Sequence, residues 1–239
     1  MKKFKIHFSF IVSFIIFVFS KYQIEYFCFL LCIFIHELGH LIALRIYNIK
    51  INCVTLYSFG FIMDSDKYKN ISDEIIIYSA GIIFNLLFMI LSKGILFEIS
   101  FLLVIVNLLP IYPLDGSNIL ESIIAYFIPY KLAVIITSII SMVTTLFVGI
   151  FFLRNFTFIL YINLLILIHQ SVLKMININK IYNVFILNKT LYNYNLPIKK
   201  IKFSHNIYNK IYKYYSIQTN IGNKEINEQD IINIKYRYK

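Results

Sequence analysis

Two imidazoles and a carboxylate interrupt an apolar stretch that is long enough to cross a membrane. They belong to the sequence HELGH at residues 36–40, inside the apolar run 26–47. On a helix, His36 and His40 lie one turn apart on the same face and can share a metal ion, while Glu37 lies beside them where a water could be activated. A carboxylate at the centre of a membrane costs roughly 2.5 to 3.5 kcal/mol on insertion scales, so Glu37 is expected to have a function.

The composition of the whole chain agrees with a membrane protein. Of its 239 residues, 59% are hydrophobic and only 15% are charged, and the mean hydropathy is +0.72. A soluble domain of this length could not bury so much apolar surface in one core. We therefore predict an all-α polytopic membrane protein.

Hydropathy predicts about six transmembrane helices, and the distribution of basic residues predicts their orientation. The first span follows three lysines but lacks a small-residue cleavage site, so it is interpreted as retained rather than as a signal peptide. The stretch from Lys174 to Lys239 carries 12 Lys or Arg and 3 acidic residues, which places both termini in the cytoplasm and the protein in the cell membrane. The predicted spans cover about residues 4–20, 26–47, 73–92, 95–115, 131–153 and 156–174.

Two segments outside the spans remain open to more than one interpretation. Residues 51–63 mix β-branched and aromatic residues around Gly60, which is typical of a short β-hairpin or re-entrant segment and equally of an interfacial loop. As a hairpin, the segment would offer an edge to an extended substrate. We divide the chain into a membrane domain at 1–174 and a basic cytoplasmic tail at 175–239, which would face anionic lipid or, less readily, dock a substrate or regulator. No nucleic-acid-binding motif is present, so nucleic acid is not an expected partner.

A hydrolytic zinc site needs a third protein ligand and an open position for water. The segment 107–116, NLLPIYPLDG, places two prolines within the fourth span, and broken backbone at membrane depth is tolerated only around protein or a wet cavity. Because the second and fourth spans run in the same direction, His40 and Asp115 are expected at similar depth. Asp115 is therefore the predicted third ligand, ahead of three rival carboxylates, Glu121, Glu98 and Asp64.

Cys28 and Cys32 share a helical face with the two histidines, yet they are interpreted as packing residues. A thiol in an apolar segment behaves as a small hydrophobe, and imidazole and carboxylate ligands suit hydrolysis better than a closed sulfur site.

Taken together, these segments resemble the site-2 protease family of intramembrane zinc metalloproteases, peptidase family M50. The resemblance rests on HExxH in one span and an NxxPxxxLDG-type segment in a later one, supported by SFGF at 58–61 and AGIIFN at 80–85. Within the family the chain is most similar to the stage IV sporulation protein FB group, which processes the sporulation sigma-K precursor. Ile82 stands where the family usually has proline.

The resemblance implies one Zn²⁺ per chain held by His36, His40 and Asp115, with Glu37 as the catalytic acid and base. Asn107 would hold substrate backbone or the oxyanion, or would form a helix–helix hydrogen bond instead. The tail is too short for the paired CBS module that binds ATP in the sporulation group, so ATP is doubtful as a cofactor. The segment 222–234 is nevertheless similar to the end of one CBS repeat.

The resemblance also implies partners and a location. A sigma-K-type precursor would be the membrane-associated substrate, inhibitory membrane proteins would be regulators, and homo-oligomers are compatible with the sequence. In a sporulating cell the site would be the mother-cell membrane around the forespore. The alternatives are a general site-2 protease that acts on another membrane-anchored regulator, a zinc-binding membrane transporter, and a pseudoenzyme that only binds partners.

Overall fold

Long apolar helices form most of the structure, and their outward faces carry large hydrophobic side chains. The computed structural model describes residues 3–58, 60–65, 70–151, 158–192, 196–202, 207–221 and 224–237. On α2 (Gln23–Ile46), for example, Phe27 and Phe34 are exposed, whereas His36 and His40 face inward. This inverted pattern suits helices whose surroundings are lipid rather than water.

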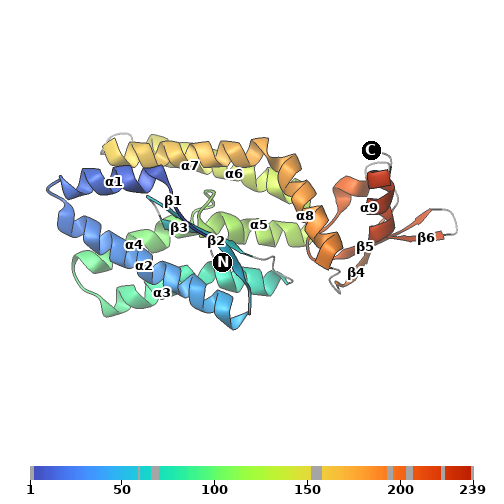
Figure 1. Ribbon diagram of the computed structural model, residues 1–239, viewed down its shortest axis with the longest axis horizontal. Helices are drawn as coiled ribbons and strands as arrows, with labels where there is room; N and C mark the ends of the chain where they lie inside the picture. The colour runs from blue at the N-terminus through green and yellow to red at the C-terminus, as the bar shows by residue number, and fades with distance from the viewer. Residues whose placement is uncertain are drawn as a thin grey trace.

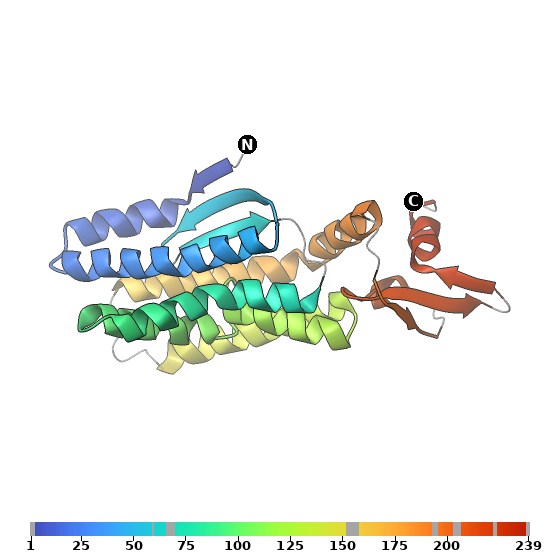
Figure 2. The same cartoon turned by 90° about the horizontal axis from the view of Figure 1, so that it is seen from below.

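Three of the described helices contain a stretch long and apolar enough to cross a membrane: α2, α3 (Ile71–Leu91) and α6 (Tyr130–Phe151), the last over Tyr130–Ile150. Three shorter apolar helical stretches accompany them, namely α1 (Phe8–Val18), α4 (Ile95–Leu108) and Leu164–Ile176 of α7 (Phe158–Ile176). The fold is mostly helical, as predicted, but it is not all-α because the tail contains a three-stranded sheet, and the number of six spans stays a prediction. In Figures 1 and 2 these helices lie roughly along the long axis of the molecule.

A three-stranded sheet lies beside this bundle. Its strands are β1 (Lys3–Ile6), β2 (Ile51–Tyr57) and β3 (Gly60–Ser65), in the order β1-β2-β3. β2 and β3 pair antiparallel across a tight turn at Gly60, whose φ of 140° suits glycine, so the predicted hairpin is confirmed. β1 pairs parallel with β2 and was not predicted, because residues 4–20 were assigned to one span.

The fourth predicted span is broken where the prolines lie, and its predicted end is wrong. α4 ends at Leu108 and a new helix, α5 (Asp115–Phe127), begins at Asp115, which the hydropathy pattern had placed at the end of the span. Pro110 and Pro113 lack an N–H and cannot continue the helical hydrogen bonds. Asp115 therefore lies in the first turn of a helix rather than in the last.

The tail forms a small α/β unit at one end of the bundle (Figure 1). It comprises α8 (Ile178–Tyr192), β4 (Ile198–Lys200), the 3₁₀ helix η1 (Ile207–Lys210), β5 (Ser216–Ile221), β6 (Lys224–Asn227) and α9 (Glu228–Arg237), with the strands in the order β4-β5-β6. One hydrophobic core joins this unit to the membrane helices. It includes Ala125 and Val134 from α5 and α6, together with Phe185, Ile186 and Tyr214 from the tail.

Candidate metal centre

Three buried side chains converge between α2 and the start of α5. Oδ2 of Asp115 lies 3.0 Å from Nε2 of His36 and 3.2 Å from Nε2 of His40, and the two Nε2 atoms are 3.1 Å apart. The helical spacing of the histidines supplies two candidate ligands, and the broken fourth span supplies the third. The structure thus brings together the three residues predicted to hold a metal ion.

The second nitrogen of each imidazole contacts α3. Nδ1 of His40 lies 2.8 Å from the carbonyl oxygen of Ile77, so this nitrogen carries the proton and Nε2 is free to bind a metal. Nδ1 of His36 lies 3.4 Å from the side-chain amide of Asn85. A half-turn of that amide would let Oδ1, which is buried without a hydrogen-bond partner among the described residues, accept the proton of His36 Nδ1.

The donor set fits a zinc ion. A tetrahedral zinc with bonds of about 2.0 to 2.1 Å holds its ligand atoms about 3.3 Å apart, close to the separations of these nitrogen and oxygen atoms. Oδ2 of Asp115 is buried with no hydrogen bond from the described residues. Protons on both Nε2 atoms would place two N–H groups against each other at 3.1 Å. A cation between the three atoms removes that conflict, and His36, His40 and Asp115 would be its ligands.

Small residues let α3 approach α2 closely enough to make these contacts. A Cβ added at Gly81 would lie 2.7 Å from Nε2 of His36, so any side chain there would displace the imidazoles. A Cβ added at Gly39 would lie 2.5 Å from the carbonyl oxygen of Ala80. The AGIIFN segment is therefore a packing surface for the HELGH helix, and Ile82, the departure from the family pattern, makes none of the contacts described at the centre.

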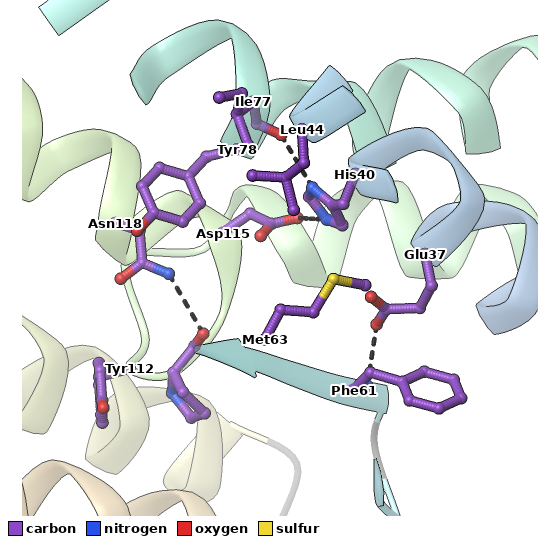
Figure 3. Close-up of a pocket in the computed structure, with 11 residues that line it drawn as sticks. Glu37, His40, Leu44, Phe61, Met63, Ile77, Tyr78, Tyr112, Asp115 and Asn118 are labelled. Carbon is purple, nitrogen blue, oxygen red and sulfur yellow. Dashed lines mark hydrogen bonds and ion pairs between the residues drawn. The ribbon is translucent and has the colours of Figure 1, made fainter. Parts of the chain in front are cut away.

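Glu37 is positioned by the sheet. Its Oε1 accepts a hydrogen bond of 2.8 Å from the backbone N–H of Phe61, the second residue of β3 (Figure 3). A Cβ added at Gly60 would lie 3.1 Å from the same oxygen, so a side chain at position 60 would crowd the carboxylate. The carboxylate borders a cavity of about 290 Å³, whose other lining residues include His40, Met63, Tyr112 and Asp115.

The loop before Asp115 is held by α6 and α7. The backbone N–H of Tyr112 donates to Oγ of Ser141 at 2.7 Å, and that hydroxyl lies 2.9 Å from Oγ of Ser171. Nearby, Nζ of Lys174 lies 2.6 Å from Oε2 of Glu121 and 4.3 Å from the centre of the Tyr112 ring. Tyr112, whose backbone N–H has no acceptor within the loop, thus takes its partners from two neighbouring helices.

The remaining predicted residues lie as follows. Asn107 lines a smaller cavity of about 40 Å³ next to Glu37, but its amide donates to Leu103 of its own helix at 3.0 Å rather than to another helix. Cys32 is buried against α4, with Sγ 3.3 Å from Oγ of Ser100, as expected of a packing residue. Among the rival carboxylates, Glu121 pairs with Lys174, Glu98 is exposed, and the side chain of Asp64 lies outside the described residues.

Sequence reasoning missed the role of Asn85 and Gly81 in orienting the histidines. The AGIIFN segment that contains Asn85 entered the sequence analysis only as support for the resemblance, yet the side chain of Asn85 contacts His36. The available signal was the spacing, because positions 81 and 85 are one helical turn apart and therefore share a face.

This fold and site define a membrane metalloprotease. Residues 24–98 match the family model described as Peptidase family M50. In three dimensions the chain is similar to the site-2 protease from Methanocaldococcus jannaschii, with a TM-score of 0.60 and 22% sequence identity over 73% of this chain and 91% of that chain. That likeness confirms the predicted fold. No curated protein sequence is significantly similar to the chain.

Proposed function

We propose that the chain is an intramembrane zinc endopeptidase that cleaves a membrane-associated regulatory precursor. The observation that carries this proposal is the convergence of Nε2 of His36, Nε2 of His40 and Oδ2 of Asp115 within 3.2 Å, with Glu37 bordering the same cavity. Zinc, when bound, lowers the pKa of a water to about 7 and polarises a carbonyl group. His36, His40 and Asp115 would hold the ion as three protein ligands, and a fourth position would be left for water, as hydrolysis requires.

Glu37 supplies the proton transfers in this proposal. The hydrogen bond from Phe61 N–H holds the carboxylate at the cavity wall, so its position does not depend on the substrate. The carboxylate takes a proton from the attacking water and returns it to the nitrogen of the leaving amine. A transporter would need the metal ligands but has no use for a glutamate anchored in this way.

The sheet offers a place for the substrate backbone. β3 is at one edge of the order β1-β2-β3, and its residues Phe61 and Met63 line the cavity. An extended peptide can add to such an edge by main-chain hydrogen bonds. Asn107, which borders the smaller cavity beside Glu37, is proposed to hold the same peptide or the developing oxyanion.

For the particular substrate, we propose a sigma-K-type precursor, on the strength of the resemblance to the sporulation group. The location in the mother-cell membrane, cytoplasmic termini and inhibitory membrane partners belong to the same proposal. The test is co-expression of a tagged sigma-K-type precursor from the same organism with the wild type, Glu37→Gln and the matched control Glu98→Gln, an exposed glutamate of α4. The wild type and the control should shorten the precursor, and Glu37→Gln should bind zinc without shortening it.

Other outcomes would redirect the proposal. If the zinc-loaded wild type leaves the precursor intact, the proposed substrate becomes another membrane-anchored regulator. Equal shortening by the wild type and Glu37→Gln would contradict the role assigned to Glu37.

A further inference from the structure

One buried stripe of α3 carries every α3 group that contacts the two histidines. Ile77 offers its carbonyl to His40, Gly81 provides space for both rings, and Asn85 contacts His36. One turn before Ile77, the same stripe begins with Glu74, which is 4% exposed. The position of α3 along its axis therefore determines the position of all three histidine contacts.

Glu74 is held by the tail. Oε1 accepts from Nζ of Lys213 at 2.6 Å, and Oε2 accepts from the hydroxyl of Tyr214, across 140 residues of sequence. Burial, together with the Glu74 carboxylate, raises the pKa of Tyr214, so the phenol stays protonated and remains the donor. A carboxylate buried to this extent needs such partners.

Tyr214 also contacts the helix that carries the third ligand. The centre of its ring lies 6.5 Å from that of Tyr126 of α5, and the ring belongs to the hydrophobic core that includes Ala125 of the same helix. Asp115 is in the first turn of α5. One phenol thus links α3, which orients the histidines, to α5, which positions Asp115.

The segment that presents Lys213 and Tyr214 is itself tied down. Nζ of Lys189 on α8 donates to the carbonyl oxygens of Tyr212 at 2.7 Å and Tyr215 at 2.6 Å, and it forms a buried ion pair of 2.7 Å with Glu228 of α9. The backbone on both sides of the two contact residues is therefore fixed to the body of the tail. The contact is made by a rigid part of the tail.

We propose that Tyr214 and Lys213 are positioning residues of the metal centre, acting through Glu74 to set the placement of α3 relative to α5. The inference rests on the proposed function, because it takes His36, His40 and Asp115 as zinc ligands. It assigns the tail a part in assembling the membrane-embedded centre, distinct from any role in binding lipid, substrate or nucleotide.

The test measures zinc affinity of the full-length chain in detergent by competition with a chelator of known affinity. Mutations of groups that orient metal ligands cost 10–100-fold in affinity, and these residues are one contact further away, so Tyr214→Phe and Lys213→Met should each lower zinc affinity by roughly threefold to tenfold. The matched controls are Tyr215→Phe, the neighbouring tyrosine, and Lys210→Met, an exposed lysine of η1. Both controls should stay within about twofold of the wild type.

A double-mutant cycle separates positioning from general stability. If Tyr214 acts through Glu74, the double variant Glu74→Gln with Tyr214→Phe should lose no more affinity than Glu74→Gln alone. A purely structural role would lower the melting temperature of the zinc-free and zinc-bound forms alike and leave the affinity of the folded fraction unchanged. That result, or additive losses in the cycle, would overturn the inference. Lys213→Met provides the same test if Tyr214→Phe does not fold.

Failure of this inference is distinguishable from failure of the proposed function. Zinc affinity is read without any substrate, so an unchanged affinity in Tyr214→Phe leaves the cleavage test with Glu37→Gln intact. Conversely, if His36→Ala bound zinc as tightly as the wild type, the assignment of His36 as a zinc ligand would be wrong, and both proposals would lose their basis.

Discussion

Gly81 of α3 lies directly against the imidazole ring of His36 of α2. A methyl group on Gly81 would lie 2.7 Å from Nε2 of His36, a separation that no ordinary contact between these atoms reaches. The backbone of α3 is therefore one wall of the site, and the absence of a side chain at position 81 is what gives both imidazoles their space.

Gly81→Ala should consequently displace the imidazoles and lower zinc affinity by about tenfold or more, since a group that fixes ligand orientation is changed. Zinc content of the purified protein and cleavage of the precursor measure the effect. Ile83→Ala, which shortens an exposed side chain two positions away, is the control and should retain zinc. Normal zinc content in Gly81→Ala would show that α3 can move away without consequence.

Asn85→Ala should weaken zinc binding about 10–100-fold, because Nδ1 of His36 loses its only contact described on α3 and the ring can then rotate. Chelator competition provides the measurement. Leu86→Ala, at an exposed position next to Asn85, should leave the affinity unchanged. Equal affinities in the two variants would assign Asn85 to packing alone.

Ser141→Ala should loosen the loop that carries Asp115. The backbone N–H of Tyr112 would lose its acceptor at 2.7 Å, and an unsatisfied buried donor costs about 1 to 3 kcal/mol. We expect a lower free energy of unfolding together with weaker zinc binding. Ser138→Ala is the control, because the hydroxyl of Ser138 donates to the carbonyl oxygen of Val134 in its own helix. It should change the free energy of unfolding and the zinc affinity much less than Ser141→Ala does.

Lys174→Met should destabilise the protein by about 3 to 5 kcal/mol, because it leaves the carboxylate of Glu121 buried without its cation. Denaturation in mixed micelles measures the free energy of unfolding. The double variant with Glu121→Leu should recover much of the loss, since a fully apolar pair carries no uncompensated charge. Lys200→Met, which breaks an exposed ion pair, should change stability by less than about 1 kcal/mol.

The local features of the fold could be predicted because local chemistry determines them. The HELGH segment is helical and places its histidines together, the prolines of residues 107–116 break the fourth span, and residues 51–63 form a hairpin. The break was located correctly but its consequence was not. Hydropathy is continuous across residues 95–115, so it gave no sign that Asp115 begins a new helix.

What the sequence did not reveal depends on contacts between distant segments. The strand Lys3–Ile6 has only four residues, and its alternation of lysine and apolar side chains is too short to be told apart from the basic start of the apolar run that follows. Glu74 looks like an ordinary acidic residue in the first turn of a helix, and its partners Lys213 and Tyr214 come from a tail that showed no recognisable fold. The convergence of His36, His40 and Asp115 beside Glu37 was predictable by residue type and spacing, whereas the groups that contact them from α3 and β3 were not.

The pairing of β1 with β2 also constrains how the protein is made. Lys3 pairs with Cys53, so the first strand leaves the ribosome roughly fifty residues before its partner. Two apolar helices, α1 and α2, are synthesised in between, so the sheet can close only after both have been made. The strand β3, which holds Glu37 in place, is completed later still, so the carboxylate of Glu37 stays unanchored until Phe61 has been made and β3 has paired with β2.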